Sequence, residues 1–132
     1  MSAELTLLVY AIALLIVVIL IQATTGVLAQ GLPPMAGNRD DLPPPKVYQG
    51  RTKRLVDNYV EGMVMYAPLA LVAAVANVSS DTTILAAQLF FYGRLAHAIV
   101  YLVGIPWVRT LAWAVSLAGT LMLLLVLLGI MH

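Results

Sequence analysis

The chain has 132 residues, of which 62% are hydrophobic and only 10% are charged. Soluble domains carry about 25% charged residues, so this composition excludes an ordinary soluble domain and, with a mean hydropathy of +0.97, predicts an integral membrane protein. The absence of cysteine excludes disulfides, thiolate metal sites and a cysteine nucleophile, and a net charge of +1 gives no reason to expect a nucleic-acid partner.

The first predicted element is an uncharged run over residues 5–29. At about 1.5 Å per residue, the run is long enough to cross a hydrocarbon core of roughly 30 Å with some tilt. A cleaved signal peptide is the alternative, because residues 27–29 resemble a cleavage site. However, Glu4 precedes the run, no Lys or Arg does, and the apolar stretch is longer than a signal peptide needs. We therefore expect a retained transmembrane helix.

The one substantial polar segment is the connection over residues 31–53. Its prolines and glycines oppose regular structure, and its charged side chains keep it in water. We expect a solvated connector without regular structure. The alternative is a lid over a site at the same membrane face.

The second predicted span covers residues 55–78 and opens beside a polar helix face. Arg54, Asn58 and Glu61 stand at i, i+4 and i+7, so they share one side of a helix. Arg54 has an alternative role as an interfacial anchor, whereas Glu61 lies about 10 Å further along the helix. Pro68 is expected to kink the span or loosen a turn.

The third predicted span, residues 83–103, follows a short turn and carries a second polar face. Arg94, His97 and Tyr101 stand at i, i+3 and i+7 in an otherwise lipid-soluble run. A guanidinium near mid-membrane is unfavourable unless it meets an acid or a water-filled cavity, which makes this face a candidate functional site.

The fourth predicted span covers residues 110–130, directly after Arg109. It carries small residues at a spacing that lets helices approach closely, namely Ala112, Ser116 and Thr120 on one row and Ala114 and Ala118 on another. The four runs together predict an all-α membrane protein, a bundle of four transmembrane helices in a single domain over residues 1–132.

The orientation follows from the basic residues, which flank the first and third connections and are missing from the termini and the second connection. The positive-inside rule places connections one and three in the cytoplasm and both termini outside. Counting depth from the cytoplasmic side brings Glu61 and Arg94 to the same level. Because an unpaired buried charge is unfavourable by several kcal/mol, we expect these two side chains to form an ion pair.

These residues form three motifs that together resemble the MAPEG family, the membrane-associated proteins in eicosanoid and glutathione metabolism. The motifs are similar to those of microsomal prostaglandin E synthase and microsomal glutathione transferase, and residues 104–113 resemble small bacterial members. In chain order they are Arg54-x-x-x-Asn58-x-x-Glu61, Gly93-Arg94-x-x-His97-x-x-x-Tyr101 and Pro106-x-x-Arg109-Thr110.

The resemblance implies a homotrimer in the inner (cytoplasmic) membrane of a bacterium, with glutathione bound between neighbouring subunits near the cytoplasmic face. It implies a glutathione-dependent transferase or peroxidase that acts on lipophilic electrophiles from the bilayer. Arg109 and Tyr101 match positions nearest the reacting sulfur. The implied glutathione-binding residues are Arg54, Asn58, Glu61, Arg94, His97, Tyr101 and Arg109.

The sequence departs from the synthase at Val56, where the synthase has a histidine, and at Trp113, where it has a tyrosine. Two other functions therefore stay open: a non-catalytic subunit of a larger membrane assembly, and a small multidrug transporter. The transporter is less favoured because that class needs an acid in its first span and residues 5–29 hold none. His97 has the further alternative of a packing role, and we expect no metal site.

Overall fold

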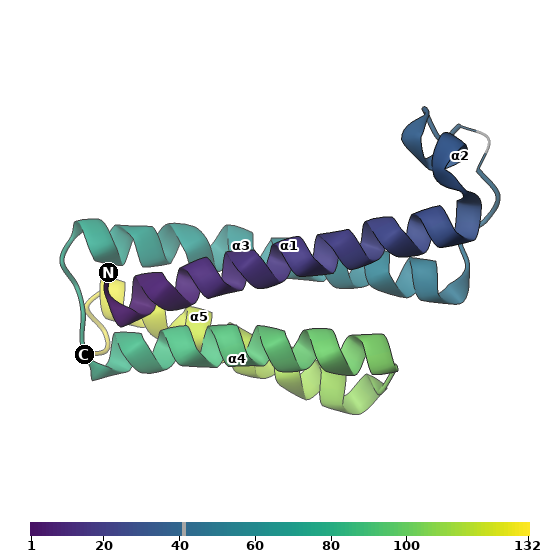
Figure 1. The fold of residues 1–132 in the computed structure, drawn as a ribbon. Coiled ribbons are helices and arrows are strands. Elements are labelled where there is room, and N and C mark those ends of the chain that lie inside the picture. Colours follow the sequence, from purple (N-terminus) through teal and green to yellow (C-terminus); the bar gives the residue numbers. More distant parts are fainter. Residues whose placement is uncertain (41) are drawn as a thin grey trace.

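The computed structural model describes residues 1–40 and 42–132, and these residues form helices without any strand. The elements are α1 (Ala3–Gln30), α2 (Leu32–Ala36), α3 (Val47–Val75), α4 (Asp81–Val103) and α5 (Pro106–Leu127). All of them except α2 are long and apolar enough to cross a membrane, and they lie side by side in one bundle (Figure 1). The prediction of an all-α bundle of four transmembrane helices is therefore confirmed.

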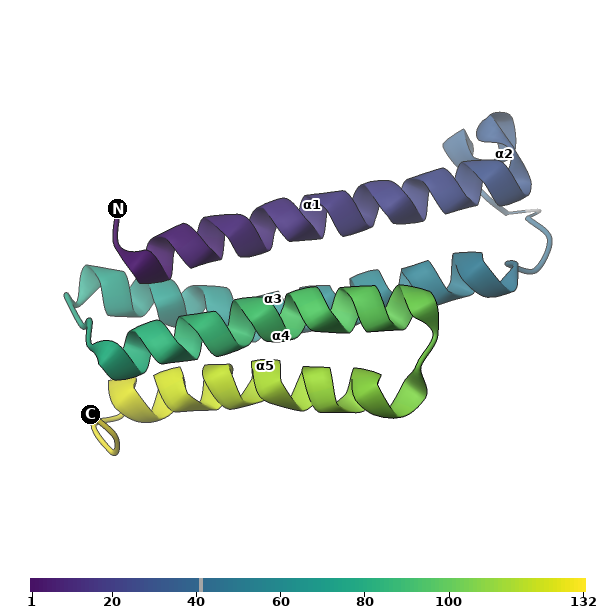
Figure 2. The ribbon, with the colours of Figure 1, turned by 60° about the horizontal axis from the view of Figure 1, so that its bottom comes forward.

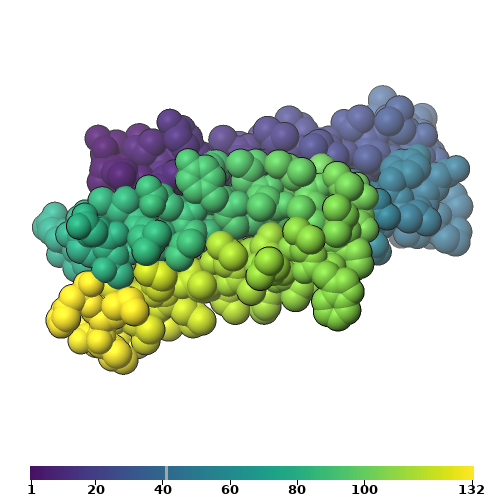
Figure 3. Space-filling view, turned by 90° about the horizontal axis from the view of Figure 1, so that it is seen from below, coloured from purple at the N-terminus to yellow at the C-terminus, as the bar shows by residue number. Residues whose placement is uncertain are grey.

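The two ends of the bundle differ in what they carry. Both termini and the turn between α3 and α4 lie at one end, whereas α2 and the turn between α4 and α5 lie at the other (Figures 1 and 2). Helices α1 and α3 have 28 and 29 residues, and α4 and α5 have 23 and 22. The first connection consequently projects beyond the ends of α4 and α5 (Figure 3).

The expectation that residues 31–53 lack regular structure was wrong in two places. Leu32–Ala36 form α2, with prolines in its first turn, where a missing N–H loses no helical bond. Helix α3 begins at Val47 rather than near residue 55, and the side chain of Gln49 accepts a hydrogen bond from the backbone N–H of Lys46 there. Residue 41 of this connection lies outside the described residues.

Contacts with α1 explain why the start of α3 is helical despite its polar sequence. The hydroxyls of Thr25 and Thr52 lie 2.9 Å apart, and Gln30 Nε2 donates to Gln49 Oε1 at 3.2 Å. Tertiary packing contributes most of the stability of helices in proteins, so these bonds outweigh weak local propensity. Helix α5 likewise begins at Pro106 rather than residue 110 and ends at Leu127 rather than 130.

Helices α4 and α5 pack backbone to backbone. A Cβ on Gly93 would lie 2.7 Å from the Ser116 nitrogen, and one on Gly119 would lie 2.5 Å from the Ala86 carbonyl oxygen. Only glycine allows approaches this close. The predicted row of Ala112, Ser116 and Thr120 is buried at this contact, whereas Ala114 and Ala118 are exposed.

The hydrophobic core lies among α1, α3, α4 and α5. The rings of Tyr66 and Phe90 stack with centroids 4.0 Å apart, and Tyr59 donates to the backbone oxygen of Ala11 at 2.5 Å. These aromatic side chains join α1, α3 and α4. The rings of Tyr59 and Phe90 also lie under the guanidinium of Arg94, which is described next.

Candidate functional site

Arg94 is the most deeply buried charge of the bundle, with 2% of its surface exposed. Its Nη1 donates to Asn58 Oδ1 at 2.6 Å and to the Asn58 backbone oxygen at 3.3 Å. Its Cζ lies 5.7 Å from the centroid of the Tyr59 ring and 5.8 Å from that of Phe90. A hydrogen-bonded cation over aromatic faces is a favourable way to bury a guanidinium.

Gly62 makes room for this guanidinium on α3. A Cβ at Gly62 would lie 2.6 Å from Arg94 Nη2 and 2.8 Å from Arg94 Cζ, so the guanidinium lies directly on the helix backbone. Sequence reasoning missed this residue. The available signal was a glycine inside a long helical run, which destabilises the helix by about 1 kcal/mol and often has a packing reason.

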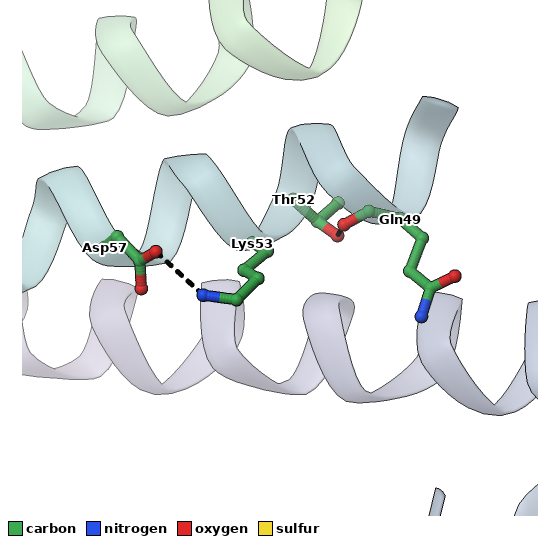
Figure 4. A network of polar contacts seen from close by, with 4 residues as sticks. All are labelled: Gln49, Thr52, Lys53 and Asp57. Atoms are coloured by element: carbon green, nitrogen blue, oxygen red, sulfur yellow. Dashed lines mark hydrogen bonds and ion pairs between the residues drawn. The ribbon is translucent and has the colours of Figure 1, made fainter. Parts of the chain in front are cut away.

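The predicted ion pair between Glu61 and Arg94 does not form. The single ion pair within the described part of the chain joins Lys53 to Asp57 at 3.0 Å (Figure 4). Asn58 and Gly62 face α4, and Glu61, about 100° around the helix from Gly62, is exposed on the outside of α3. Depth along the bundle was therefore matched correctly, but the rotation of α3 brings an amide to Arg94 instead of the acid.

A cavity of about 240 Å³ opens beside Asn58, the residue that binds Arg94. Three helices line it, with Asn58 from α3, His97 and Tyr101 from α4, and Arg109, Thr110 and Trp113 from α5. Four of the seven predicted site residues, Asn58, His97, Tyr101 and Arg109, therefore meet in one cavity.

The cavity places a cation next to a phenol and an imidazole. Arg109 Cζ lies 4.7 Å from the centroid of the Tyr101 ring, and the His97 and Tyr101 rings have centroids 5.3 Å apart. His97 Nδ1 is buried without a hydrogen-bond partner among the described residues. The arrangement offers positive charge and hydrogen-bonding groups to an anionic ligand.

The short turn after α4 is what brings Arg109 back against Tyr101. Helix α4 ends at Gly104, whose φ of 91° is left-handed, and α5 begins two residues later. Arg51 of α3 lies over this turn, where its Nη1 donates to the Leu102 backbone oxygen at 3.4 Å. A cation at a helix C-terminus is favourable, so Arg51, which sequence reasoning did not single out, positions the turn.

Arg54 and Glu61 lie outside the cavity. Both are exposed on α3, and Arg54 folds back so that a Cβ on Gly50 would lie 3.2 Å from its Nη1. Arg94 lies behind the cavity wall and reaches it through Asn58. Thr110 and Trp113 line the cavity although only Thr110 belongs to a predicted motif.

Within the described residues, no group of His, Asp and Glu side chains is arranged to hold a metal ion. A model of the MAPEG family matches residues 5–129 of the chain. No curated protein and no solved structure matches it.

Proposed function

Since the chain belongs to the MAPEG family, we propose that this multi-pass membrane protein is a glutathione-dependent transferase or peroxidase acting on lipophilic electrophiles. One observation carries the proposal: Asn58, His97, Tyr101 and Arg109 converge on a single cavity. Glutathione has two carboxylates, an amine and a thiol, which suit arginines, an acid and polar donors. His97 lines the same cavity and adds an imidazole beside the Tyr101 ring.

In this proposal, Arg109 and Tyr101 act on the sulfur. Glutathione would supply a thiol. As the thiolate it would form a C–S bond to an electrophilic carbon and displace that carbon's leaving group. With a peroxide it would cleave the O–O bond and release an alcohol, and a second glutathione would then reduce the resulting sulfenic acid to give the disulfide and water. The Arg109 charge, held 4.7 Å from the Tyr101 ring centroid, lowers the pKa of a thiol placed beside it. Tyr101 donates a hydrogen bond to the same sulfur. Asn58 and His97 orient the peptide, and Arg94 fixes Asn58 through its bond at 2.6 Å.

A homotrimer is part of the proposal, because Arg54 and Glu61 face outward from the single subunit. A carboxylate within a membrane helix needs a partner or a polar cavity. A neighbouring subunit packed on this face of α3 would enclose both side chains and let them contact glutathione from the other side of the cavity.

The proposed location is the inner membrane of a bacterium, with both termini on the non-cytoplasmic side. The first connection, the basic start of α3 and Arg109 lie at one end of the bundle, and the termini lie at the other (Figure 1). This grouping supports the orientation given by the positive-inside rule and puts the cavity near the cytoplasm.

Calorimetric titration of the detergent-solubilised protein with glutathione tests the function. We expect saturable binding and thiolate absorbance near neutral pH. Arg109→Ala should weaken binding at least tenfold, since a charge-assisted hydrogen bond contributes about 1.5–3 kcal/mol, and should abolish the thiolate signal. Lys46→Gln, which removes a charge outside the cavity, should change neither. Millimolar glutathione giving no heat and no thiolate signal would refute the proposal.

The second candidate is a non-catalytic subunit of a larger membrane assembly. It is favoured by the bond between Arg94 and Asn58, which satisfies the buried cation within one subunit and gives these residues a structural role without any ligand. Purification in mild detergent distinguishes the two functions, because only the second requires a stable partner and no glutathione binding.

A further inference from the structure

A separate cavity of about 450 Å³ lies where the first connection folds back onto the bundle. It is bounded by the end of α1, by α2, by the start of α3 and by residues 42–45. It shares no lining residue with the cavity around Arg109. The proposed glutathione chemistry assigns it no role.

The polar side of this cavity carries two cations, Arg39 and Lys53, and the amides of Gln22 and Gln49. Arg39 has a left-handed backbone (φ 67°), and its Nε donates to the Met35 backbone oxygen at 2.7 Å, which fixes the guanidinium over α2. Gln49 and Lys53 extend from successive turns of α3 (Figure 4). Gln49 Oε1 already accepts from Gln30 and from the Lys46 backbone, so the Gln49 amide nitrogen remains to donate.

The cavity is cationic. Arg39 and Lys53 are the ionisable side chains that line it within residues 1–40 and 42–132, and both are positive. Lys53 pairs with Asp57 at 3.0 Å, but the two side chains are 65% and 60% exposed. Exposed pairs of this kind contribute little to stability, so Lys53 can exchange Asp57 for another anion.

The remaining walls are mostly apolar. A Cβ on Gly26 would lie 2.6 Å from Met35 Cε, so the methionine covers the α1 backbone directly. Leu42 and the prolines that follow it complete the wall. A ligand in this cavity would meet cations at one end and apolar side chains along the rest of its length.

We propose that this cavity binds the phosphate headgroup of an anionic phospholipid. Phosphate chemistry suits a guanidinium, an ammonium and an amide donor. The cavity lies where the apolar helix α1 ends, which is the level of lipid headgroups, and basic pockets at such levels bind anionic lipids. The apolar wall favours a lipid over free phosphate because it packs against the glycerol and acyl part.

Native mass spectrometry of the detergent-solubilised protein, titrated with phosphatidylglycerol or phosphatidylcholine, tests this site. We expect phosphatidylglycerol to bind and phosphatidylcholine not to bind. Each basic residue near a membrane contributes about 1 kcal/mol, so Arg39→Gln and Lys53→Gln should each weaken binding about fivefold. Lys46→Gln removes a charge from the same connection but not from the cavity, and it should leave binding unchanged. The Lys53 side chain is exposed, so its replacement reports on binding without a risk to folding.

An equal loss of phosphatidylglycerol binding in Arg39→Gln, Lys53→Gln and Lys46→Gln would overturn the proposal, since the general positive charge of the surface would then explain the binding. Binding of inorganic phosphate or glycerol phosphate as tightly as the lipid would assign the cavity to a soluble anion. Displacement of the lipid by glutathione would make the cavity part of the thiol site. Failure of glutathione to bind at all leaves these lipid measurements unaffected, so the two proposals are tested separately.

Discussion

The bundle buries two charges, Glu4 at the end that carries the termini and Arg94 within α4, and the two differ in what surrounds them. Glu4, with 8% of its surface exposed, accepts hydrogen bonds through Oε1 from Ser79 at 2.7 Å and from Thr83 at 2.8 Å. Arg94 donates to Asn58 at 2.6 Å. Each keeps one buried atom without a partner among the described residues, Oε2 of Glu4 and Nε of Arg94.

The difference lies in the neighbouring space. Glu4 joins the start of α1 to the turn and first residues of α4, and it lines none of the cavities described above. Arg94 holds Asn58, which does line the cavity around Arg109. Burial of a charge therefore does not identify a functional site by itself. We infer that Glu4 stabilises the fold, and that Arg94 also positions a residue of the proposed glutathione site.

The largest expected effect comes from closing the space over Arg94. In Gly62→Ala the new Cβ would lie 2.6 Å from Nη2 of a guanidinium enclosed by Tyr59 and Phe90. Moving the guanidinium breaks its bond to Asn58, so we expect a loss of about 2–3 kcal/mol in the free energy of unfolding, together with weaker glutathione binding. Denaturant unfolding in detergent and calorimetry measure the two effects.

Gly50→Ala is the matched control, because it too places a Cβ against an arginine on α3. There the Cβ would lie 3.2 Å from Nη1 of Arg54, which is exposed and free to move. Helix propensity should then stabilise the variant by up to about 1 kcal/mol. A loss in Gly50→Ala as large as that in Gly62→Ala would show that the packing of Arg94 is not the cause.

The next effect tests Glu4, at the end of the bundle that carries the termini. Glu4→Ala removes the acceptor shared by the Ser79 and Thr83 hydroxyls, and we expect a loss of about 1–2 kcal/mol, because release of a buried carboxylate offsets part of the lost bonds. Glu4→Gln keeps an acceptor and should lose less. Thermal unfolding measures both variants, and glutathione affinity should not change. A large change in affinity would remove the distinction between the two buried charges.

Much of the fold follows from the sequence because the composition leaves few alternatives. Four apolar runs with short turns must form a helical bundle, and the polar faces of α3 and α4 bring Asn58, His97 and Tyr101 together. The partner of Arg94 could not be predicted in the same way. Neighbouring residues such as Glu61 and Gly62 differ by about 1.5 Å in depth but by about 100° in direction, and only tertiary packing sets the rotation of α3.

The start of α3 shows a second limit. Local propensity favoured an irregular segment over residues 47–53, but bonds from Thr25 and Gln30 of α1 hold it in a helix. Those partners lie 27 and 19 residues away from Thr52 and Gln49 in the sequence. Window-based reasoning does not see such contacts, and it therefore also missed the cavity that this extension of α3 helps to form.

The smallest expected effect is the coupling between Glu61 and Arg94, and measuring it separates the observed partner of Arg94 from the predicted one. Two double-mutant cycles share Arg94→Met, one with Asn58→Ala and one with Glu61→Gln. Direct contact at 2.6 Å should give Asn58 and Arg94 a coupling of about 0.5–3 kcal/mol in unfolding free energy. Glu61 makes no ion pair with Arg94, so that coupling should stay within about 0.5 kcal/mol, whatever Glu61→Gln alone does to the proposed trimer. Strong coupling to Glu61 together with none to Asn58 would mean that α3 is rotated in the membrane so that the acid, and not the amide, faces α4.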